Sequence, residues 1–528
     1  MKRRKVSRIM SLFLALTMTS LLAAGCGQKS SPNGSADAPA NADSTSTDPS
    51  ASTGTTPAYK DTLTIAHWEE PTTLDPQAQG KMSCGAVTVQ IYDTLITLDE
   101  NKSPVPALAE KWEQIDDTTF RFYLREGVKF HNGDTLTAED VRYTIARACT
   151  NPGSSSTYKS FDGENTKVID DLTVEIKLKS PDASIFDTLN GQRGGIVCKR
   201  AVEELGEDAY GHAPVGTGPY KLEEWQTGTE LHLVANEDYW GEAPKTPNIV
   251  FKIITESANR VIEMETGNAD ICLNVLASEV ARLEEAEGLH VEMGTGYQYT
   301  TVTFNMQDPV LSDIRVRQAL VAAIDREAIV NAVYKGTATV ADSIMPTTLL
   351  GAKTYDPNLY DVEKAKALLA EAGYADGLTI NFVVQPLEEM QRITEAIQNM
   401  WKQIGVETNV STAEVAAYLA QGNTLQVGIR NGSASDPAST LIIYDSAFGD
   451  RLNSNNAELD KMLADAKGIY DVNERAAAYH EICDYLWEAK WSLPIAFKKT
   501  IYALSDKVEG FEFDAMNYLE MEKISVAE

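Results

Sequence analysis

The chain has 528 residues, of which 43% are hydrophobic and 23% are charged. These fractions are typical of folded globular proteins, so they exclude a fibrous chain and a wholly disordered one. Aspartate and glutamate outnumber lysine and arginine by 77 to 46, which gives a formal net charge of -31. Because such a charge repels the phosphate backbone, we expect no nucleic-acid partner.

The first residues have the pattern of a secretory signal. Five cationic side chains between residues 2 and 8 precede an apolar run from Ile9 to Leu22. This pattern predicts a signal peptide over residues 1–25, and the run is shorter than the roughly 20 residues that span a bilayer. No later segment is long and apolar enough to cross a membrane. The residues before Cys26 are small, and this segment resembles the lipobox of bacterial lipoproteins, which implies that Cys26 receives lipid; alternatively, Cys26 is an ordinary cysteine in a plain signal peptide.

Residues 26–58 form a second distinct segment, composed almost entirely of small and polar residues with no aromatic or large aliphatic side chain. Such a segment cannot bury enough apolar surface to offset the backbone entropy lost on folding. We therefore expect a disordered tether, which would hold the folded body roughly 30 Å from its anchor.

The remaining chain alternates between strand-like and helix-like patterns. Apolar residues recur with the period of a half-buried strand in residues 119–124 and 172–178. Thr137 is followed by acidic residues, a pattern typical of the start of a helix. Asp325 and Asp361 are expected to cap two further helices. A strand is also expected at residues 378–384. This mixture over a long chain predicts an α/β fold with more than one lobe.

Local patterns of catalysis and metal binding are absent from the sequence. The histidines stand apart, without the HExxH spacing of a zinc site. There is no CxxC pair, no phosphate-binding GxxxxGK[ST] loop and no GxSxG nucleophile motif. We therefore expect no enzyme, no cofactor and no bound metal. The cysteines other than Cys26 are odd in number, so at least one should remain free or pair between chains.

The longest continuous stretch with a sequence pattern typical of one protein family runs from Phe120 to Val141 and includes Arg125-Glu126-Gly127. Further characteristic segments are Leu74-Asp75-Pro76, Tyr92-Asp93-Thr94-Leu95, Pro106 to Trp112, Pro214 to Tyr220, Asn236 to Gly241, Gly267 to Asp270, Phe304-Asn305, and Asp313 to Leu320. Together these segments resemble the family 5 extracytoplasmic solute-binding proteins of ABC importers, which include oligopeptide, dipeptide and nickel-complex receptors. The resemblance covers roughly residues 60 to 510.

The resemblance implies a two-lobe α/β fold of the periplasmic-binding-protein type (type II, cluster C) with a third subdomain inserted into the first lobe. The implied boundaries are 59–84, 214–303 and 494–528 for the first lobe, 85–213 for its inserted subdomain, and 304–493 for the second lobe. The chain would cross between the lobes near Phe304 and return near Pro494. Arg125, Arg315 and Arg317 are expected to form internal salt bridges rather than ligand contacts.

The resemblance also implies where a ligand binds. The expected ligand-binding residues are Gly80, Lys81, Met82, Ser83 and Cys84 in the first lobe, and Gln385, Arg430, Asn431, Gly432, Ser433 and Asp436 in the second. A plain packing role is the alternative for Cys84.

One departure from the family pattern bears on the ligand. Peptide receptors of the family carry an aspartate three positions before an Asp-Pro pair, where it accepts the α-ammonium group, and a tryptophan three positions before that. Counting back from Asp436, these places hold Ser433 and Arg430. A neutral hydroxyl lacks the stronger charge-assisted hydrogen bond, and Arg430, if it faces the cleft, suits a carboxylate or phosphate. One hypothesis is therefore an anionic or amine-blocked ligand. The other is that Arg430 points to solvent or pairs with a neighbouring acid, and that Asp436 or another acid takes the ammonium group; both hypotheses stay open.

The function implied by the resemblance is that of a lipid-anchored binding protein, which captures a small molecule outside the cell and delivers it to an ABC permease and its ATPase. Candidate ligands are a peptide, a modified peptide, an opine-like compound or a chelated metal. We expect a monomer on the outer face of the plasma membrane, in the periplasmic space if there is an outer membrane. The alternative is a lipoprotein of this fold that serves as a sensor or adhesin, and an enzyme ranks third because it would need a cofactor motif.

Overall fold

The computed structural model describes residues 58–414, 417–418, 426–448, 452 and 454–528. The predicted signal peptide, Cys26 and all but the last residue of the predicted tether lie outside the described residues. Within those residues, none of the helices combines the length and the apolar composition that a bilayer crossing requires.

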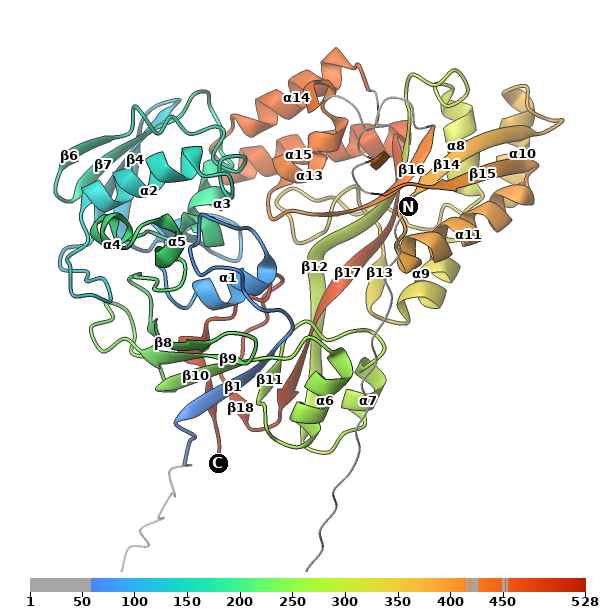
Figure 1. Cartoon of the computed structure of the whole chain (residues 1–528). Coiled ribbons are helices and arrows are strands. Elements are labelled where there is room, and N and C mark those ends of the chain that lie inside the picture. The colour runs from blue at the N-terminus through green and yellow to red at the C-terminus, as the bar shows by residue number, and fades with distance from the viewer. Residues whose placement is uncertain (1–57, 415–416, 419–425, 449–451, 453) are drawn as a thin grey trace, which may run out of the picture. The chain divides into compact units, whose positions relative to one another are not determined.

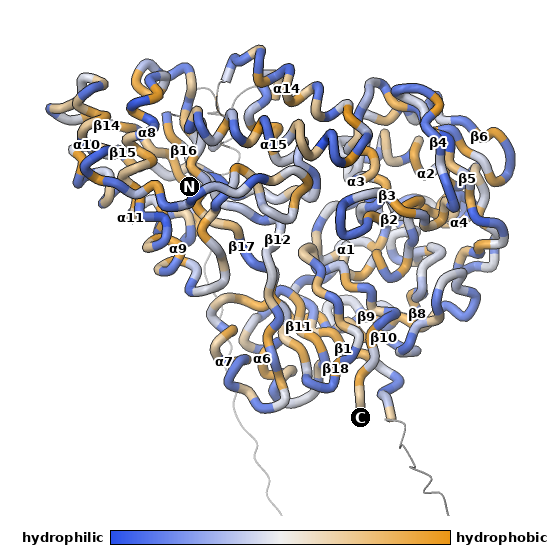
Figure 2. Tube along the Cα trace, turned by 180° about the vertical axis from the view of Figure 1, so that it is seen from behind, coloured by the Kyte–Doolittle hydropathy of each residue, from blue (hydrophilic) through white to orange (hydrophobic). Residues whose placement is uncertain are grey.

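An 11-stranded sheet runs through the whole body (Figure 1). Its strands are ordered β15-β14-β16-β12-β17-β11-β1-β10-β9-β8, with β13 paired to β17. The bounds are β1 (Thr62–His67), β8 (Tyr220–Gln226), β9 (Glu230–Ala235), β10 (Asn248–Ile253), β11 (Ile271–Cys272), β12 (Leu289–Phe304), β13 (Ala338–Val340), β14 (Leu378–Val384), β15 (Val406–Thr412), β16 (Val427–Ser433) and β17 (Ser492–Ser505). In Figure 2 the apolar stretches gather on strands such as β1, β10 and β11, where the buried core lies.

Two long strands, β12 and β17, belong to both lobes. They pair with each other along most of their length, but the register breaks between Thr295 and Tyr299. The two sides of this break face different cores: Ile501 packs in a cluster of the first lobe, whereas Phe304 and Leu493 pack in the main cluster of the second. The crossing therefore lies within the two strands, a few residues before Phe304 on β12 and after Pro494 on β17. Such an irregularity bends a strand locally.

The first lobe carries the expected insertion. A separate four-stranded sheet, in the order β4-β5-β7-β6, lies within residues 85–213. The insertion and the segment before it contain α1 (Met82–Thr88), β2 (Ile96–Leu98), β3 (Pro104–Pro106), β4 (Ala109–Asp116), β5 (Thr119–Leu124), α2 (Ala138–Thr150), β6 (Lys167–Asp170), β7 (Thr173–Lys177), α3 (Ile185–Asn190), η1 (Gln192–Gly194), α4 (Lys199–Leu205) and α5 (Glu207–Tyr210). Phe122 in the insertion and Leu63 in the large sheet share one buried cluster. The insertion is therefore fused to the first lobe through a common core.

The second lobe has two cores. Helices α8 (Ile314–Ala322), α9 (Arg326–Tyr334), α10 (Val362–Glu371) and α11 (Glu388–Lys402) contribute to the core that contains β14 and β16, and α13 (Pro437–Leu441), α14 (Ala457–Lys467) and α15 (Val472–Ala489) contribute to another. The first lobe adds α6 (Ser257–Glu265) and α7 (Val280–Glu284) to its own sheet, and the C-terminal segment contains β18 (Val508–Glu509), η5 (Met521–Lys523) and β19 (Ser525–Val526).

The predicted helix starts are confirmed in detail. Thr137 and Asp140 form a capping box at the start of α2, which satisfies backbone donors that a helix end leaves unpaired. Asp325 accepts a hydrogen bond from the Ala328 N–H at 2.9 Å, and Asp361 accepts one from the Lys364 N–H at 2.9 Å. The predicted strands 119–124 and 378–384 coincide with β5 and β14.

The prediction for the three arginines is right for one of them and wrong for two. Arg315 pairs with Asp313 at 2.6 Å. Arg317 instead donates to backbone carbonyls, including that of Ala489 at 2.8 Å from its Nη2 atom, and Arg125 donates to a carbonyl and lies over the Trp240 ring at 4.9 Å. Helix ends and loops leave carbonyls that need donors, and a buried guanidinium can satisfy several at once.

The five cysteines in the described part of the chain are all free thiols.

Candidate functional site

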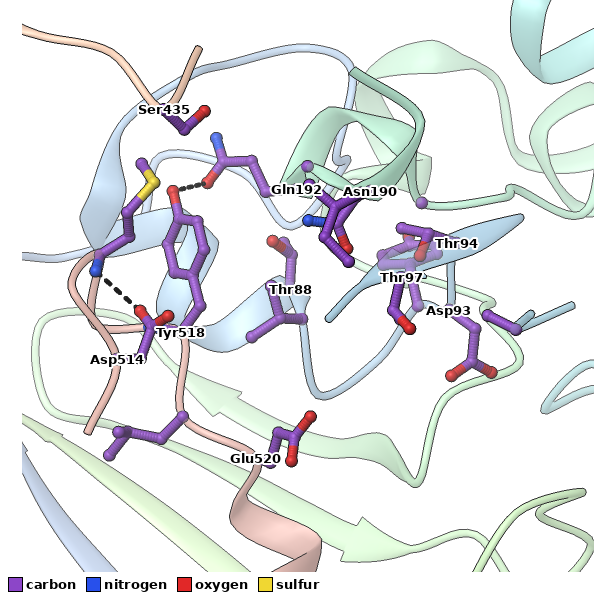
Figure 3. A pocket seen from close by; sticks show the side chains of 18 of the residues that line it. Thr88, Asp93, Thr94, Thr97, Asn190, Gln192, Ser435, Asp514, Tyr518 and Glu520 are labelled. Atoms are coloured by element: carbon purple, nitrogen blue, oxygen red, sulfur yellow. Dashed lines mark hydrogen bonds between the residues drawn. The ribbon is translucent and has the colours of Figure 1, made fainter. Parts of the chain in front are cut away.

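Two adjoining cavities lie where the inserted subdomain, the second lobe and the C-terminal segment meet. The larger, of about 790 Å³, is lined from residues 80–82, 156–160, 182–193, 433–448, 463–467 and 516–518. The smaller, of about 510 Å³ and shown in Figure 3, is lined from residues 88–107, 187–195, 219–240, 297, 435 and 514–522. Both volumes fall in the range of sites for small molecules.

The two cavities share a wall, so we treat them as one cleft. The residues that line both are Asp187, Gly191, Gln192, Ser435, Met516 and Tyr518. The Tyr518 hydroxyl donates to Gln192 Oε1 at 2.6 Å, which ties the C-terminal segment to the insertion across this wall (Figure 3). Ser435 comes from the second lobe, so a molecule in the cleft would touch both lobes.

In the first predicted segment, Gly80 and Met82 line the larger cavity. Lys81 is exposed and forms an ion pair with Glu69. Ser83 is buried and donates to Glu69 at 2.8 Å. Cys84 is fully buried, which agrees with a packing role. The structure thus brings Gly80 and Met82 to the cavity, whereas Lys81, Ser83 and Cys84 are not among the residues that line it.

In the second predicted segment, Ser433 and Asp436 line the larger cavity. Gln385, Arg430, Asn431 and Gly432 are not among the residues that line either cavity.

Three of these four residues have contacts or burial that the structure defines apart from the cavity lining. Asn431 Oδ1 accepts a hydrogen bond from Thr300 Oγ1 at 2.7 Å. A Cβ on Gly432 would lie 2.3 Å from the Tyr299 ring, so only glycine fits there. Gln385 is half-buried.

The Arg430 guanidinium is partly buried. Its Nε and Nη1 atoms are buried and have no hydrogen-bond partner among the described residues. The pKa of the nearby Tyr444 is raised by burial, while the charge of Arg430 acts to lower that pKa. A buried guanidinium without an acceptor is costly, but its place is next to Tyr444 rather than in the cavity lining.

Sequence reasoning missed most of the charged residues of the cleft. The carboxyl groups in its lining are Asp93, Asp182, Asp187, Asp436, Asp445, Asp514, Glu520 and Glu522, and the cationic side chains are Lys102, Lys159, Arg193 and Lys467. Burial raises the pKa of Glu522 to about 7, and burial also raises the pKa of Asp93 and of Asp514. The lining of the cleft therefore contains more acidic than basic side chains, and burial makes ionisation of Asp93, Asp514 and Glu522 less favourable.

Arg193 forms part of the cavity wall beside Gly80. Its Nε donates to the Gln79 carbonyl at 3.2 Å and its Nη1 to Thr157 Oγ1 at 3.2 Å. Burial lowers the pKa of Arg193. A Cβ on Gly80 would lie 1.6 Å from Arg193 Nη2, so glycine lets the guanidinium rest against the backbone.

Over the described ranges, no group of three or more histidine, cysteine, aspartate or glutamate side chains is placed to hold a metal ion.

The body has two α/β lobes, a pair of strands that crosses between them, and a cleft lined by both lobes. This arrangement defines the class of periplasmic-type solute-binding proteins. The family described as bacterial extracellular solute-binding proteins, family 5 Middle, matches residues 103–451. The chain belongs to this family.

The relatives of the chain are binding proteins. It is 29% identical over 487 residues to heme-binding protein A of Haemophilus influenzae, covering 84% of this chain and 88% of the relative. It is 27% identical over 484 residues to the dipeptide-binding protein of Escherichia coli, covering 84% and 90%. The structure of HbpA2 from Haemophilus parasuis matches with a TM-score of 0.81 at 27% identity, covering 88% of this chain and 100% of that chain.

Proposed function

We propose that this chain is the solute-binding lipoprotein of an ABC importer, which captures a peptide or peptide-like small molecule and delivers it to a membrane permease. The observation that carries the proposal is a ligand-sized cleft lined by both lobes in a member of this family. The dipeptide-binding relative supports a peptide as the ligand class. The protein would act as a receptor and release its ligand unaltered, rather than as an enzyme.

The proposed mechanism follows from the position of the cleft. A ligand that contacts the insertion and the second lobe together gains contacts in the closed form that the open form lacks. It shifts the population toward the closed form by the difference between its two affinities. Gly80, Met82, Ser433 and Asp436 are proposed to contact the ligand, and Lys81, Ser83, Cys84, Gln385, Arg430, Asn431 and Gly432 to shape the wall behind it.

The proposed location is the outer face of the plasma membrane, within the periplasm if there is an outer membrane. Lipid on Cys26 and a tether over residues 26–58 would keep the monomeric body near the permease. Tethering raises the local concentration of a binding module at its partner.

The direct test is ligand capture by the body purified from residue 58 onward. It would be incubated with a mixture of di- to tetrapeptides, washed, and analysed by native mass spectrometry. We expect retention of intact peptides in a one-to-one complex, and loss of peptide uptake by cells that lack the gene. Chemical turnover of the peptides would contradict a receptor. Retention without any effect on uptake would favour the sensor or adhesin.

A further inference from the structure

We propose that the side chains of Tyr518 and Gln192 form a bridge that confines the ligand to the larger cavity and so limits the length of the peptides that the protein retains. The bridge stands between the larger cavity and the smaller one. This inference rests on the proposed function, because it names the length of ligand that the same cleft accepts.

The Tyr518–Gln192 bridge lies at the boundary between the two cavities. Both side chains are among the residues that line the larger cavity and also the smaller one. They reach this boundary from separate parts of the first lobe: Gln192 belongs to η1, just after α3, and Tyr518 belongs to the C-terminal segment (Figure 3). A peptide that extended from one cavity into the other here would have to part the two side chains.

The bridge packs against the backbone of α1. The Tyr518 hydroxyl donates to Gln192 Oε1 at 2.6 Å. A Cβ on Gly85 of α1 would lie 1.9 Å from that oxygen and 2.5 Å from Cε1 of the Tyr518 ring. Both side chains therefore lie close to the helix at a position without a side chain, and neither has room to withdraw toward α1.

The main chain around Tyr518 is held on both sides. The Tyr518 N–H donates to Asp514 Oδ1 at 2.7 Å, and the same oxygen accepts a hydrogen bond from the Met516 N–H at 2.7 Å. On the other side, the Leu519 carbonyl accepts a hydrogen bond from Gln90 Nε2 at 2.7 Å, and both of these residues are buried. The Tyr518 ring therefore projects from an ordered segment.

The turn that carries Gln192 is held in a similar way. The carbonyl of the next residue, Arg193, accepts a hydrogen bond from the hydroxyl of the fully buried Tyr158 at 3.0 Å. The Arg193 side chain donates to the Gln79 carbonyl at 3.2 Å. Both partners of the bridge thus have supports of their own, as a fixed boundary of a binding site requires.

The two cavities differ in what the second lobe contributes to them. The lining of the larger cavity includes second-lobe residues within 433–448 and 463–467. Among the described residues, Ser435 alone represents the second lobe in the lining of the smaller cavity. A molecule in the larger cavity therefore touches both lobes, whereas one in the smaller cavity touches almost nothing but the first lobe.

This difference gives the bridge a function. A ligand shifts the population of the closed form only by the difference between its affinities for the two forms. Contacts in the smaller cavity would be nearly equal in both forms, so a peptide that extended into it would bind more tightly without favouring closure. By confining the peptide to the larger cavity, the bridge keeps its contacts where they depend on both lobes.

The test measures the longest peptide that the body from residue 58 onward retains. The probe is a library of random di- to octapeptides with equal molar amounts of each length, and native mass spectrometry reads the length of each retained peptide. We expect a sharp upper limit for the wild-type protein. Tyr518→Ala and Gln192→Ala should each raise that limit by about one or two residues, since an extended residue spans about 3.3–3.6 Å. Gln192→Ala removes the smaller side chain, so it keeps the test valid if Tyr518→Ala folds poorly.

The matched control is Asn190→Ala. Asn190, the last residue of α3, carries the same amide group as Gln192 but lines only the smaller cavity. The variant enlarges a compartment that the bridge keeps closed, so the longest retained peptide should have the same length as for the wild type. A higher limit for Asn190→Ala would mean that the wild-type ligand already enters the smaller cavity, and would overturn the inference.

Two further outcomes separate this inference from the proposed function. One common limit for the wild type, Tyr518→Ala and Gln192→Ala, or equal wild-type retention of every length, would overturn the role of the bridge and leave the proposed peptide receptor standing. Retention of no peptide at any length would contradict the proposed function and this inference with it.

Hydrogen–deuterium exchange gives a second readout, from the wall of the smaller cavity. Residues within 94–107 line that cavity and not the larger one. Exchange in this segment should be unchanged when the wild type binds its longest retained peptide, and should slow when Tyr518→Ala binds a longer one. Protection of residues 94–107 in the wild type would count against the bridge as a boundary.

Discussion

At the scale of single residues, the acids of the cleft differ in the hydrogen bonds that support their charge. Asp93 is satisfied by hydrogen bonds from Trp240 Nε1 at 2.7 Å and Thr217 Oγ1 at 2.8 Å, whereas Asp187 has no such support. A carboxylate whose folded-state pKa is raised lowers stability where it ionises in the unfolded chain. The effect of the Asp187 carboxylate on thermal stability can be measured without knowing the ligand.

Asp187→Asn should make the ligand-free body more heat-stable at alkaline pH. The folded-state pKa of Asp187 is raised to about 8, above the value of roughly 3.9 in an unfolded chain. The folded state therefore binds the proton more tightly, and stability falls as pH rises between these two values. The variant lacks this loss, so its melting temperature should exceed the wild type's by about 1–3 °C at pH 8 and match it near pH 4.

Differential scanning fluorimetry across this pH range is sufficient. Glu520→Gln should show no gain that grows with pH. A melting temperature of Asp187→Asn below that of the wild type at pH 8 would show that the Asp187 carboxylate has a stabilising partner.

Gly80→Ala tests whether the wall beside Arg193 belongs to the site. The added methyl group would meet Arg193 Nη2, which lies at the end of a flexible side chain, so the guanidinium must shift and reshape the wall of the larger cavity. We expect peptide affinity to fall several-fold, by about 1 kcal/mol of binding free energy, with little change in melting temperature. Calorimetry measures the affinity, and an unchanged Kd would place the ligand away from this wall.

At the scale of elements, Tyr470 joins the inserted subdomain to the second lobe, as do Lys467, which pairs with Asp182, and Arg475, which donates to the Ala183 carbonyl. Tyr470, between α14 and α15, places its ring 5.0 Å from that of Phe120. Its hydroxyl donates to the Asp117 carbonyl at 2.9 Å and accepts from the Asp182 N–H at 3.0 Å. The second lobe thus adds an aromatic ring to the core of the insertion.

Tyr470→Ala should weaken this junction. Loss of the ring contacts and of both hydrogen bonds should lower the free energy of unfolding by about 2–4 kcal/mol, and Tyr470→Phe, which keeps the ring, by about 1 kcal/mol. Urea denaturation monitored by tryptophan fluorescence compares the two variants. Equal losses would mean that the hydroxyl, rather than the ring, holds the junction.

The elements themselves were largely predictable from sequence, because local chemistry fixes them. Caps at Thr137, Asp325 and Asp361 and the alternation in residues 119–124 act over a few positions, and the structure confirms all four. The candidate site was less predictable. Asp187 lies in a short helix with no motif around it, and its environment arises only where α3 meets the second lobe.

The partners of the buried arginines could not be predicted for the same reason. Arg317 donates hydrogen bonds to carbonyls at the end of α15, far along the chain. Its positive charge alone suggests a carboxylate as its partner instead. Of the residues predicted around Arg430 and Asp436, Ser433 and Asp436 line the larger cavity, and strand alternation influences which side chains of β16 face it. Arg430 has its Nε and Nη1 atoms buried, and its charge acts on Tyr444.

At the scale of the whole molecule, an acidic receptor body is proposed to stay attached to a membrane by lipid on Cys26. Replacement of that cysteine by serine should leave binding unchanged and move the protein from the membrane fraction to the soluble fraction. Cell fractionation followed by immunoblotting measures this shift. A Cys26→Ser protein that stays entirely with the membrane would contradict the lipid anchor.

The central claim is that one ligand is held by both lobes at once in the cleft. Hydrogen–deuterium exchange with and without a retained peptide tests it most directly. The account predicts protection in all three parts of the cleft wall: α3 in the insertion, α13 in the second lobe, and residues 514–522. Protection confined to a single lobe, or absent from α3 and α13, would contradict it.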